Sequence, residues 1–207
     1  MEFGIEIGEL PYSKSVIKDV SGLILAGGES SRYGRNKALV NFNGMPLIQR
    51  VSRVMQSLFH EVIIITNTPE EYSFLKLPMC EDLIKGLGPL GGLFTGLTRM
   101  TNDAGFLVGC DMPFLNRKLI RHIVEIRDDC DVIVPSISGM MEPLHALYGQ
   151  GCLPAIRQLI DSRKYQIGQF FTEVSVKYID EDTIRFFDPE MRCFYNINEP
   201  RHLNSID

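Results

Sequence analysis

Residues 25–37 read Leu-Ala-Gly-Gly-Glu-Ser-Ser-Arg-Tyr-Gly-Arg-Asn-Lys, and they continue an apolar run that starts at residue 22. That run, Gly-Leu-Ile-Leu-Ala, is typical of a strand buried on both faces. A strand that ends in two glycines lets a ligand approach the backbone closely and offers it free N–H groups. Arg32, Arg35 and Lys37 then place three cations within six residues of a net acidic chain. Clustered cations beside a glycine turn suit a polyphosphate, so the stretch predicts a phosphate-binding loop.

The alternative is a solvated basic loop between a strand and a hairpin, and for Arg35 alone that is the better interpretation. Gly27, Gly28, Arg32 and Lys37 taken together favour phosphate binding. The loop is not a P-loop. The motif GxxxxGK[ST] requires a glycine spacing that is not present here, and Arg35 stands where that motif has lysine.

Short apolar runs alternate with longer amphipathic stretches along most of the chain. The expected strands are residues 22–26, 40–42, 62–66, 106–109, 132–135, 145–148 and 175–179. The main expected helices are 46–58, a helix that follows the glycine-rich segment 86–92 and runs to residue 100, a helix capped by Asn116 that runs to about residue 128, and 153–161. Strands that alternate with helices of this length indicate βαβ units and a mostly parallel sheet. We therefore expect an α/β fold, with a last helix that starts near residue 199.

Three polar segments follow predicted strands, and ligands bind beyond the carboxyl ends of strands in open sheets of this kind. The segments are residues 27–37, residues 81–92 and the stretch around Asp111. A carboxylate at Asp111, beside a phosphate loop, suits Mg²⁺, which usually takes one or two carboxylates plus substrate phosphates. Capping of the next helix is the alternative, although Asn116 is better placed for that. Asp82 could bond a ribose or nucleobase, assist the metal, or be an ordinary surface acid.

Composition limits the class of protein. The chain has 207 residues, of which 44% are hydrophobic and 23% charged, and its net charge of −5 argues against a nucleic-acid partner. No apolar run approaches the roughly 20 residues of a membrane helix, which argues against a membrane partner, and the start of the chain does not read as a signal peptide. Five scattered cysteines without a CxxC pair read as reduced thiols. The expected location is cytoplasmic.

A second glycine pattern points elsewhere. Residues 86–91 match GxGxxG, and Asp111 follows 20 residues after Gly91, as in a dinucleotide-binding fingerprint. A complete strand–helix–strand unit precedes the pattern, however, and Pro89 removes a backbone N–H from the turn. A nicotinamide or flavin enzyme stays a minor alternative. His145 could be a base, but no other histidine has a spacing that suggests a triad or metal site, so a structural role is expected.

Five segments together resemble a known family. Residues 25–37 resemble the LAGGxxxRMGxxK signature of α/β nucleotidyltransferases, and residues 43–47 resemble the NGKPL segment that follows it. Tyr33 and Met45 replace the usual methionine and lysine. The acid–GPLGG pattern at 81–92, Cys-Asp-Met-Pro-Phe at 110–114 and Phe-Tyr-Asn-Ile-Asn-Glu-Pro at 194–200 are most similar to the molybdenum cofactor guanylyltransferase (MobA-like) family. The resemblance implies a three-layer Rossmann-like nucleotidyltransferase fold over residues 22–207, with residues 1–21 as an N-terminal extension.

The family transfers GMP from GTP to the terminal phosphate of molybdopterin that carries molybdenum, and it releases pyrophosphate. The resemblance therefore implies GTP and Mo-molybdopterin as substrates, Mg²⁺ as cofactor, and molybdoenzyme apoproteins or cofactor-insertion proteins as further partners to consider. It assigns Leu25, Ala26 and Gly27 to the guanine nucleotide, Arg32 and Lys37 to its phosphates, Asp82 to GTP, Asp111 to Mg²⁺, and Asn196 and Asn198 to the pterin. Arg32, Lys37 and Asp111 would be the catalytic groups.

The residues alone leave other functions open. Base choice depends on loop shape, so a molybdopterin cytidylyltransferase is the nearest alternative and a sugar-phosphate nucleotidyltransferase the next. A non-catalytic GTP-binding module that carries molybdopterin to a partner is the alternative outside enzymology.

Overall fold

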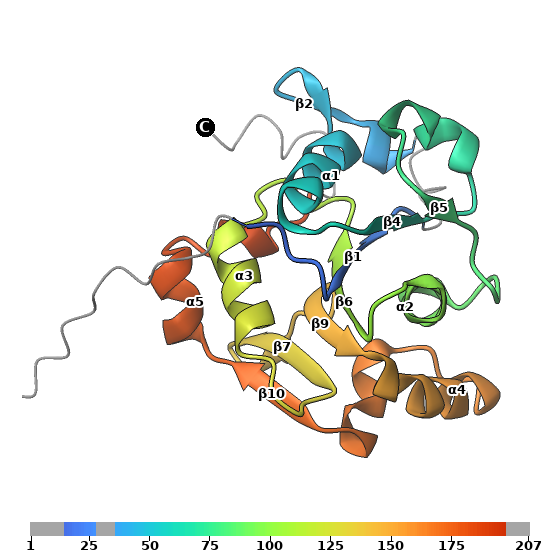
Figure 1. Cartoon of the computed structure of the whole chain (residues 1–207), viewed down its shortest axis with the longest axis vertical. Helices are drawn as coiled ribbons and strands as arrows, with labels where there is room; N and C mark the ends of the chain where they lie inside the picture. The colour runs from blue at the N-terminus through green and yellow to red at the C-terminus, as the bar shows by residue number, and fades with distance from the viewer. Residues whose placement is uncertain (1–14, 28–35, 198–207) are drawn as a thin grey trace, which may run out of the picture.

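A central β-sheet runs through the molecule and has helices on both faces (Figure 1). The computed structural model describes residues 15–27 and 36–197. In their order across the sheet, the strands are β10 (Val176–Ile179), β7 (Val132–Ile137), β9 (His145–Gly149), β6 (Ala104–Gly109), β1 (Ser21–Leu25), β4 (Val62–Ile65) and β5 (Met79–Cys80). A short strand, β8 (Met140–Met141), pairs with β7, and β2 (Asn41–Phe42) and β3 (Met45–Pro46) form a separate hairpin.

Most neighbouring strands are parallel, as the alternating pattern predicted. β1 lies between β4 and β6 and is parallel to both, β5 is parallel to β4, and β10 is parallel to β7. Only β9, among the strands on the main path through the described sheet, runs antiparallel to its neighbours β6 and β7. The carboxyl ends of β1, β4, β5 and β6 therefore meet at one edge of the sheet.

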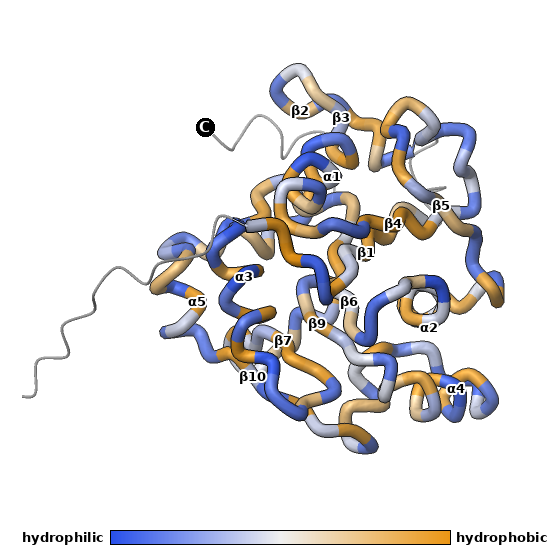
Figure 2. The backbone as a smooth tube through the Cα atoms, viewed as in Figure 1, coloured by the Kyte–Doolittle hydropathy of each residue, from blue (hydrophilic) through white to orange (hydrophobic). Residues whose placement is uncertain are grey.

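The helices form two layers, and each layer closes one hydrophobic core (Figure 2). The layer that covers one face consists of α1 (Leu47–Leu58), α3 (Arg117–Glu125) and α5 (Glu181–Phe187), and the other consists of α2 (Gly88–Arg99) and α4 (Leu153–Asp161). Side chains alternate along β1: Ile24 enters the first core, whereas Leu23 and Leu25 enter the second. The three-layer α/β fold is confirmed.

Helix α3 shows how local sequence sets an element's start. Asn116 caps it, because its side-chain oxygen accepts hydrogen bonds from the backbone N–H groups of Lys118 and Leu119. Helix α3 ends at Glu125, three residues before the predicted end at residue 128. Strands β5 and β8 were not predicted because two residues show no alternation, and helix α5 was not predicted because its seven residues make only about two helical turns. The helix expected from residue 199 lies outside the described residues.

The glycines of α2 allow the helix to approach β1 closely. A Cβ atom on Gly92 would lie 2.7 Å from Leu25 Cδ2, and one on Gly96 would lie 2.8 Å from Leu23 Cδ1. Close packing of a helix on a strand therefore accounts for glycine at these positions without a dinucleotide. The GxGxxG glycines themselves have local roles: Gly86 and Gly88 adopt positive φ angles in the turn that leads into α2, and a Cβ on Gly91 would lie 3.2 Å from the Ile84 carbonyl oxygen.

The segment before β1 also contacts the core. Val20 is fully buried, and Ile17 forms a bridge with Phe59 at the end of α1; residues 1–14 lie outside the described part. All five cysteines are free thiols. No helix within residues 15–27 and 36–197 has both the length and the apolar character needed to cross a membrane.

Candidate active site

Four polar side chains follow the carboxyl ends of four adjacent strands. Asp111 follows β6, Lys37 opens the 3-10 turn η2 (Lys37–Leu39) that comes after β1, Asn67 follows β4, and Asp82 follows β5. In parallel sheets this edge is where ligands bind. The sequence predicted Lys37, Asp82 and Asp111 at this edge; it did not single out Asn67.

Lys37 and Asp111 form an ion pair, although 74 residues separate them in the sequence. The Lys37 Nζ atom lies 2.7 Å from Asp111 Oδ2, and the two side chains are 27% and 23% exposed. A charge-assisted bond of this length is short and partly shielded from solvent. The predicted convergence of Lys37 with the distant aspartate is therefore present in the fold, and both side chains remain partly exposed to a ligand.

Local backbone contacts hold Asp111 in place. The N–H of Cys110 donates to the carbonyl of Leu25 at 3.0 Å, so the residues after β6 continue the contact with β1. Gly109 leaves room for the carboxylate: a Cβ there would lie 2.7 Å from Asp111 Oδ1. Burial raises the pKa of the Cys110 thiol to about 12, so this neighbour stays protonated and is a poor nucleophile or metal ligand.

Lys37 is held by the residue before it, which the sequence did not single out. Asn36 caps the turn η2, because its Oδ1 accepts from the Ala38 N–H at 3.0 Å. Its Nδ2 donates to the Tyr72 hydroxyl at 2.7 Å and to the Glu71 carboxylate. A polar residue next to a cation was the only sequence signal, since these partners lie 35 and 36 residues away.

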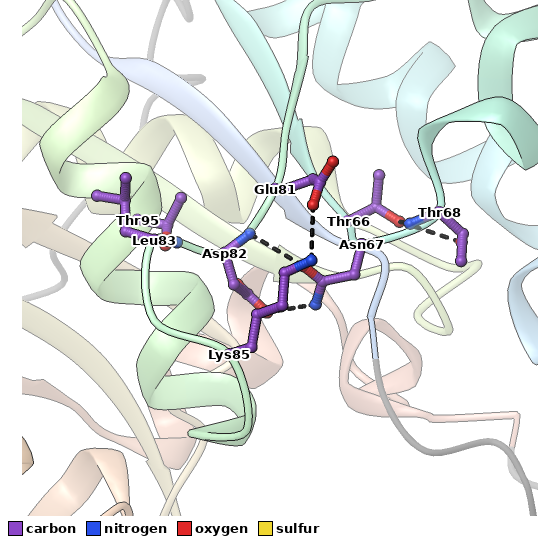
Figure 3. Close-up of polar contacts among 8 residues, drawn as sticks. All are labelled: Thr66, Asn67, Thr68, Glu81, Asp82, Leu83, Lys85 and Thr95. Carbon is purple, nitrogen blue, oxygen red and sulfur yellow. Dashed lines mark hydrogen bonds and ion pairs between the residues drawn. The ribbon is translucent and has the colours of Figure 1, made fainter.

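Asp82 is paired with Asn67 on the neighbouring strand end (Figure 3). Asn67 Nδ2 donates to Asp82 Oδ2 at 2.7 Å, and the Asp82 N–H donates to Asn67 Oδ1 at 3.2 Å. Just beyond, Lys85 forms an ion pair with Glu81 at 2.8 Å, and the Leu83 N–H donates to Thr95 Oγ1. The signal that could have identified Asn67 is its position directly after a β-branched strand end.

The two pairs lie at opposite ends of a row of strand ends. Three strand spacings separate β6 from β5, which is about 14 Å across the sheet. Leu25, Ala26 and Gly27 lie between them, and the Ala26 N–H donates to Ile65 O at 2.9 Å. A Cβ on Gly27 would meet no atom of the described residues within 4 Å, so none of them covers this glycine. An extended nucleoside triphosphate can bridge such a row.

The C-terminal segment passes beside Asp111. The Ile197 N–H donates to the Asp111 carbonyl at 3.0 Å, and the buried Ile197 side chain packs with Phe42 and Leu47. This contact places the half-buried Asn196 next to the Asp111 loop. Arg32 and Asn198, the other predicted site residues, lie outside the described residues.

His145 is a core side chain, as the sequence led us to expect. It is fully buried between Phe106 and Phe194, with ring centroids 5.3 and 5.0 Å away. Neither ring nitrogen has a hydrogen-bond partner among the described residues. Burial lowers the pKa of His145 to about 3, so the ring is neutral at pH 7.

The side chains at this edge fit a Mg²⁺ ion that shares its coordination shell with substrate phosphates. They do not fit a site in which the protein supplies every ligand. No cluster of three or more His, Cys, Asp or Glu side chains in the described ranges could hold a metal. Mg²⁺ commonly takes one or two carboxylates and completes its shell with water and substrate phosphates. Asp111 is such a carboxylate.

Comparison with known proteins shows the family of this chain. The family model described as MobA-like NTP transferase domain matches residues 22–175. A probable molybdenum cofactor guanylyltransferase of Pelotomaculum thermopropionicum is 36% identical, over 88% of this chain and 89% of that one. A molybdenum cofactor guanylyltransferase of Desulfosudis oleivorans is 35% identical, over 91% and 94%.

Solved structures show the same fold. Molybdopterin-guanine dinucleotide biosynthesis protein A of Archaeoglobus fulgidus superposes with a TM-score of 0.78 at 24% identity, over 91% of this chain and 96% of that one. For 2-C-methyl-D-erythritol 4-phosphate cytidylyltransferase of Thermus thermophilus the TM-score is 0.67 at 14% identity, over 90% and 96%. With the family model matched over most of its length, this chain belongs to the MobA-like NTP transferase family.

Proposed function

We propose that this protein is a molybdenum cofactor guanylyltransferase, which transfers GMP from GTP to the terminal phosphate of Mo-molybdopterin and releases pyrophosphate. The relatives at about 35% identity carry that name and match along almost their whole length. The observation that carries the proposal is the 2.7 Å pair of Lys37 and Asp111 at the strand ends. It supplies one cation for phosphates and one carboxylate for a metal.

The reaction needs alignment more than it needs a base. An oxygen of the acceptor phosphate forms a bond to the α-phosphorus of GTP, and the bond from that phosphorus to the α,β-bridging oxygen breaks. Pyrophosphate leaves with the electron pair. Because the acceptor phosphate is already an anion, the main barriers are its repulsion from the triphosphate and the charge that develops on the leaving group.

Lys37 would meet the first of these barriers by donating hydrogen bonds to phosphate oxygens. Its amine already points at a carboxylate oxygen in a partly shielded site, so a phosphate oxygen can take over that position. Asp111 would hold Mg²⁺, which when bound neutralises phosphate charge. Arg32, in the same basic segment, would add a second cation.

The other end of the row would bind the nucleoside. The Asp82 carboxylate, oriented by Asn67, can accept hydrogen bonds from ribose hydroxyls or from guanine N–H groups. Leu25, Ala26 and Gly27 offer backbone groups between the two ends, where none of the described residues covers Gly27. Asn196, and with it Asn198, would face the pterin, whose polar edge suits amides that both donate and accept.

The test is a turnover assay with purified protein, Mo-molybdopterin, Mg²⁺ and either GTP or CTP. We expect pyrophosphate and a molybdopterin–guanine dinucleotide from GTP, with little product from CTP. A clear preference for CTP would overturn the guanine assignment. Stabilisation of the fold by GTP without turnover would instead support the carrier module, since a ligand that binds the folded state raises its melting temperature.

A further inference from the structure

Tyr72 connects the core to the turn that carries Lys37. It belongs to η3 (Pro69–Leu75), the 3-10 segment between β4 and β5, and its side chain is only 2% exposed. Its hydroxyl lies 2.7 Å from Asn36 Nδ2, which donates to it. A buried phenol is thus bonded to a residue at the rim of the site, 36 positions earlier in the sequence.

Asn36 has a single orientation, because each of its polar groups has a partner. Its oxygen caps η2 through the Ala38 N–H, and its Nδ2 hydrogens go to Tyr72 and Glu71. Lys37 follows directly, in a turn of three residues whose middle residue, Ala38, is buried. The position of the Lys37 backbone therefore depends on the partners of Asn36.

The surroundings of the Tyr72 hydroxyl suit a fixed anchor. Its ring packs in the same core as Ala38, and burial raises the pKa of Tyr72 to about 12, so the hydroxyl stays neutral. Cys110, the residue before Asp111, packs against this same core. The Tyr72 ring therefore belongs to the core that supports the residues before both members of the ion pair, Asn36 through a hydrogen bond and Cys110 through packing.

We propose that Tyr72 is a positioning residue for nucleotidyl transfer, and that its hydrogen bond to Asn36 holds Lys37 opposite Asp111. The inference rests on the proposed function. Tyr72 would not touch the substrate; it would act through Asn36 and Lys37. Removal of residues that orient the ligands of a metal site typically lowers activity about 10–100-fold, and we expect a loss on that scale here.

The test compares two tyrosines of the same kind. Tyr72→Phe deletes the hydroxyl bonded to Asn36, whereas Tyr148→Phe deletes an equally buried hydroxyl that donates to the Pro143 carbonyl at 2.7 Å. We expect kcat for GTP-dependent pyrophosphate release to fall about 10–100-fold in Tyr72→Phe, with a smaller change in KM. Tyr148→Phe should keep the kcat of the unmodified protein. Equal kcat values in the two variants would overturn the inference.

A second arm asks whether the effect passes through Lys37. In a Lys37→Ala background the additional Tyr72→Phe change should lower kcat by less than about twofold, since groups that act as a unit are not additive. A full multiplicative loss in the double variant would show a purely structural role and contradict the proposal.

Two controls keep the result interpretable. If Tyr72→Phe does not fold by circular dichroism, Asn36→Ala removes the other partner without disturbing the tyrosine ring. It should lower kcat at least as much, because it also removes the η2 cap and the bond to Glu71. Absence of guanylyl transfer by the unmodified protein would overturn the proposed function. An active unmodified protein beside a fully active, folded Tyr72→Phe or Asn36→Ala would overturn the positioning inference alone.

Discussion

Two polar pairs at one sheet edge have the same bond length and different character. Lys37 and Asp111 join two full charges at 2.7 Å with both side chains about a quarter exposed. Asn67 and Asp82 join a neutral amide to a carboxylate, also at 2.7 Å, with the amide exposed. Charges in a partly shielded site interact more strongly than in water. The first pair therefore suits a ligand that is itself highly charged, and the second suits orientation of a less charged group.

The largest expected effect lies in the charged pair. Asp111→Asn keeps the shape of the side chain but removes the charge that would hold Mg²⁺. Loss of one such preorganised group typically costs about 10²–10³ in kcat. Steady-state kinetics with GTP and Mg²⁺ will measure it, alongside a melting curve to show that the fold persists. Near-normal turnover would remove Asp111 from the proposed role.

A smaller effect is expected when the same carboxylate is only displaced. In Gly109→Ala the new methyl group would lie 2.7 Å from Asp111 Oδ1, so the carboxylate has to shift, and this disturbs the contact of its Oδ2 with Lys37. A displacement of about 1 Å can cost up to about 10²-fold in rate, and we expect a loss of kcat below that of Asp111→Asn. Gly149→Ala is the matched control, because the nearest atom to its Cβ is 3.5 Å away, an ordinary contact. Equal activity of the two variants would refute the prediction.

The amide pair should affect binding more than turnover. Asp82→Asn replaces an acceptor that is proposed to bond the nucleoside, and a hydrogen bond to a charged group contributes about 1.5–3 kcal/mol. We expect KM for GTP to rise about tenfold or more, with kcat changed little, because the interaction would be equal in ground and transition states. A drop in kcat as large as that of Asp111→Asn would mean that the two pairs do not divide the work in this way.

His145 provides a contrast to both pairs, since it lies in the core and should affect stability alone. Its pKa is about 6.5 when unfolded and about 3 when folded, where the nearby Asp188 only partly opposes burial. The neutral, buried His145 therefore contributes its full stability above pH 6.5. As the pH falls from there toward 3, protonation of this side chain in the unfolded chain lowers the free energy of unfolding by up to about 1.4 kcal/mol per pH unit. In denaturant titrations between pH 7.5 and 5, His145→Phe should show a weaker loss of stability than the unmodified chain. Parallel pH dependences would contradict this assignment.

Sequence predicted the parts of the site that follow long apolar runs. The strands before Gly27 and before Asp111 are continuous hydrophobic segments, so their carboxyl ends, and the polar residues there, could be located. Asn36, Tyr72 and Asn67 could not, because their importance comes from single hydrogen bonds to residues 15 to 36 positions away.

The fold also combines elements that the sequence predicts, because they have long apolar runs, with elements that are too short to predict. Strand β5 has two residues and no readable period, yet it places Asp82 at the sheet edge. The glycines of α2 were open to a cofactor-binding interpretation, because close helix–sheet packing and close cofactor approach both require glycine. The sequence could not show that Gly92 and Gly96, which directly follow the GxGxxG pattern, pack against Leu25 and Leu23 of β1.

The most direct measurement is a crystal structure of the unmodified protein with a non-hydrolysable GTP analogue and Mn²⁺ in place of Mg²⁺. Anomalous scattering should locate the metal on the carboxylate of Asp111, with the amine of Lys37 on a phosphate oxygen and the nucleoside toward Asp82. A triphosphate bound away from Lys37 and Asp111, or a metal on other ligands, would contradict the account.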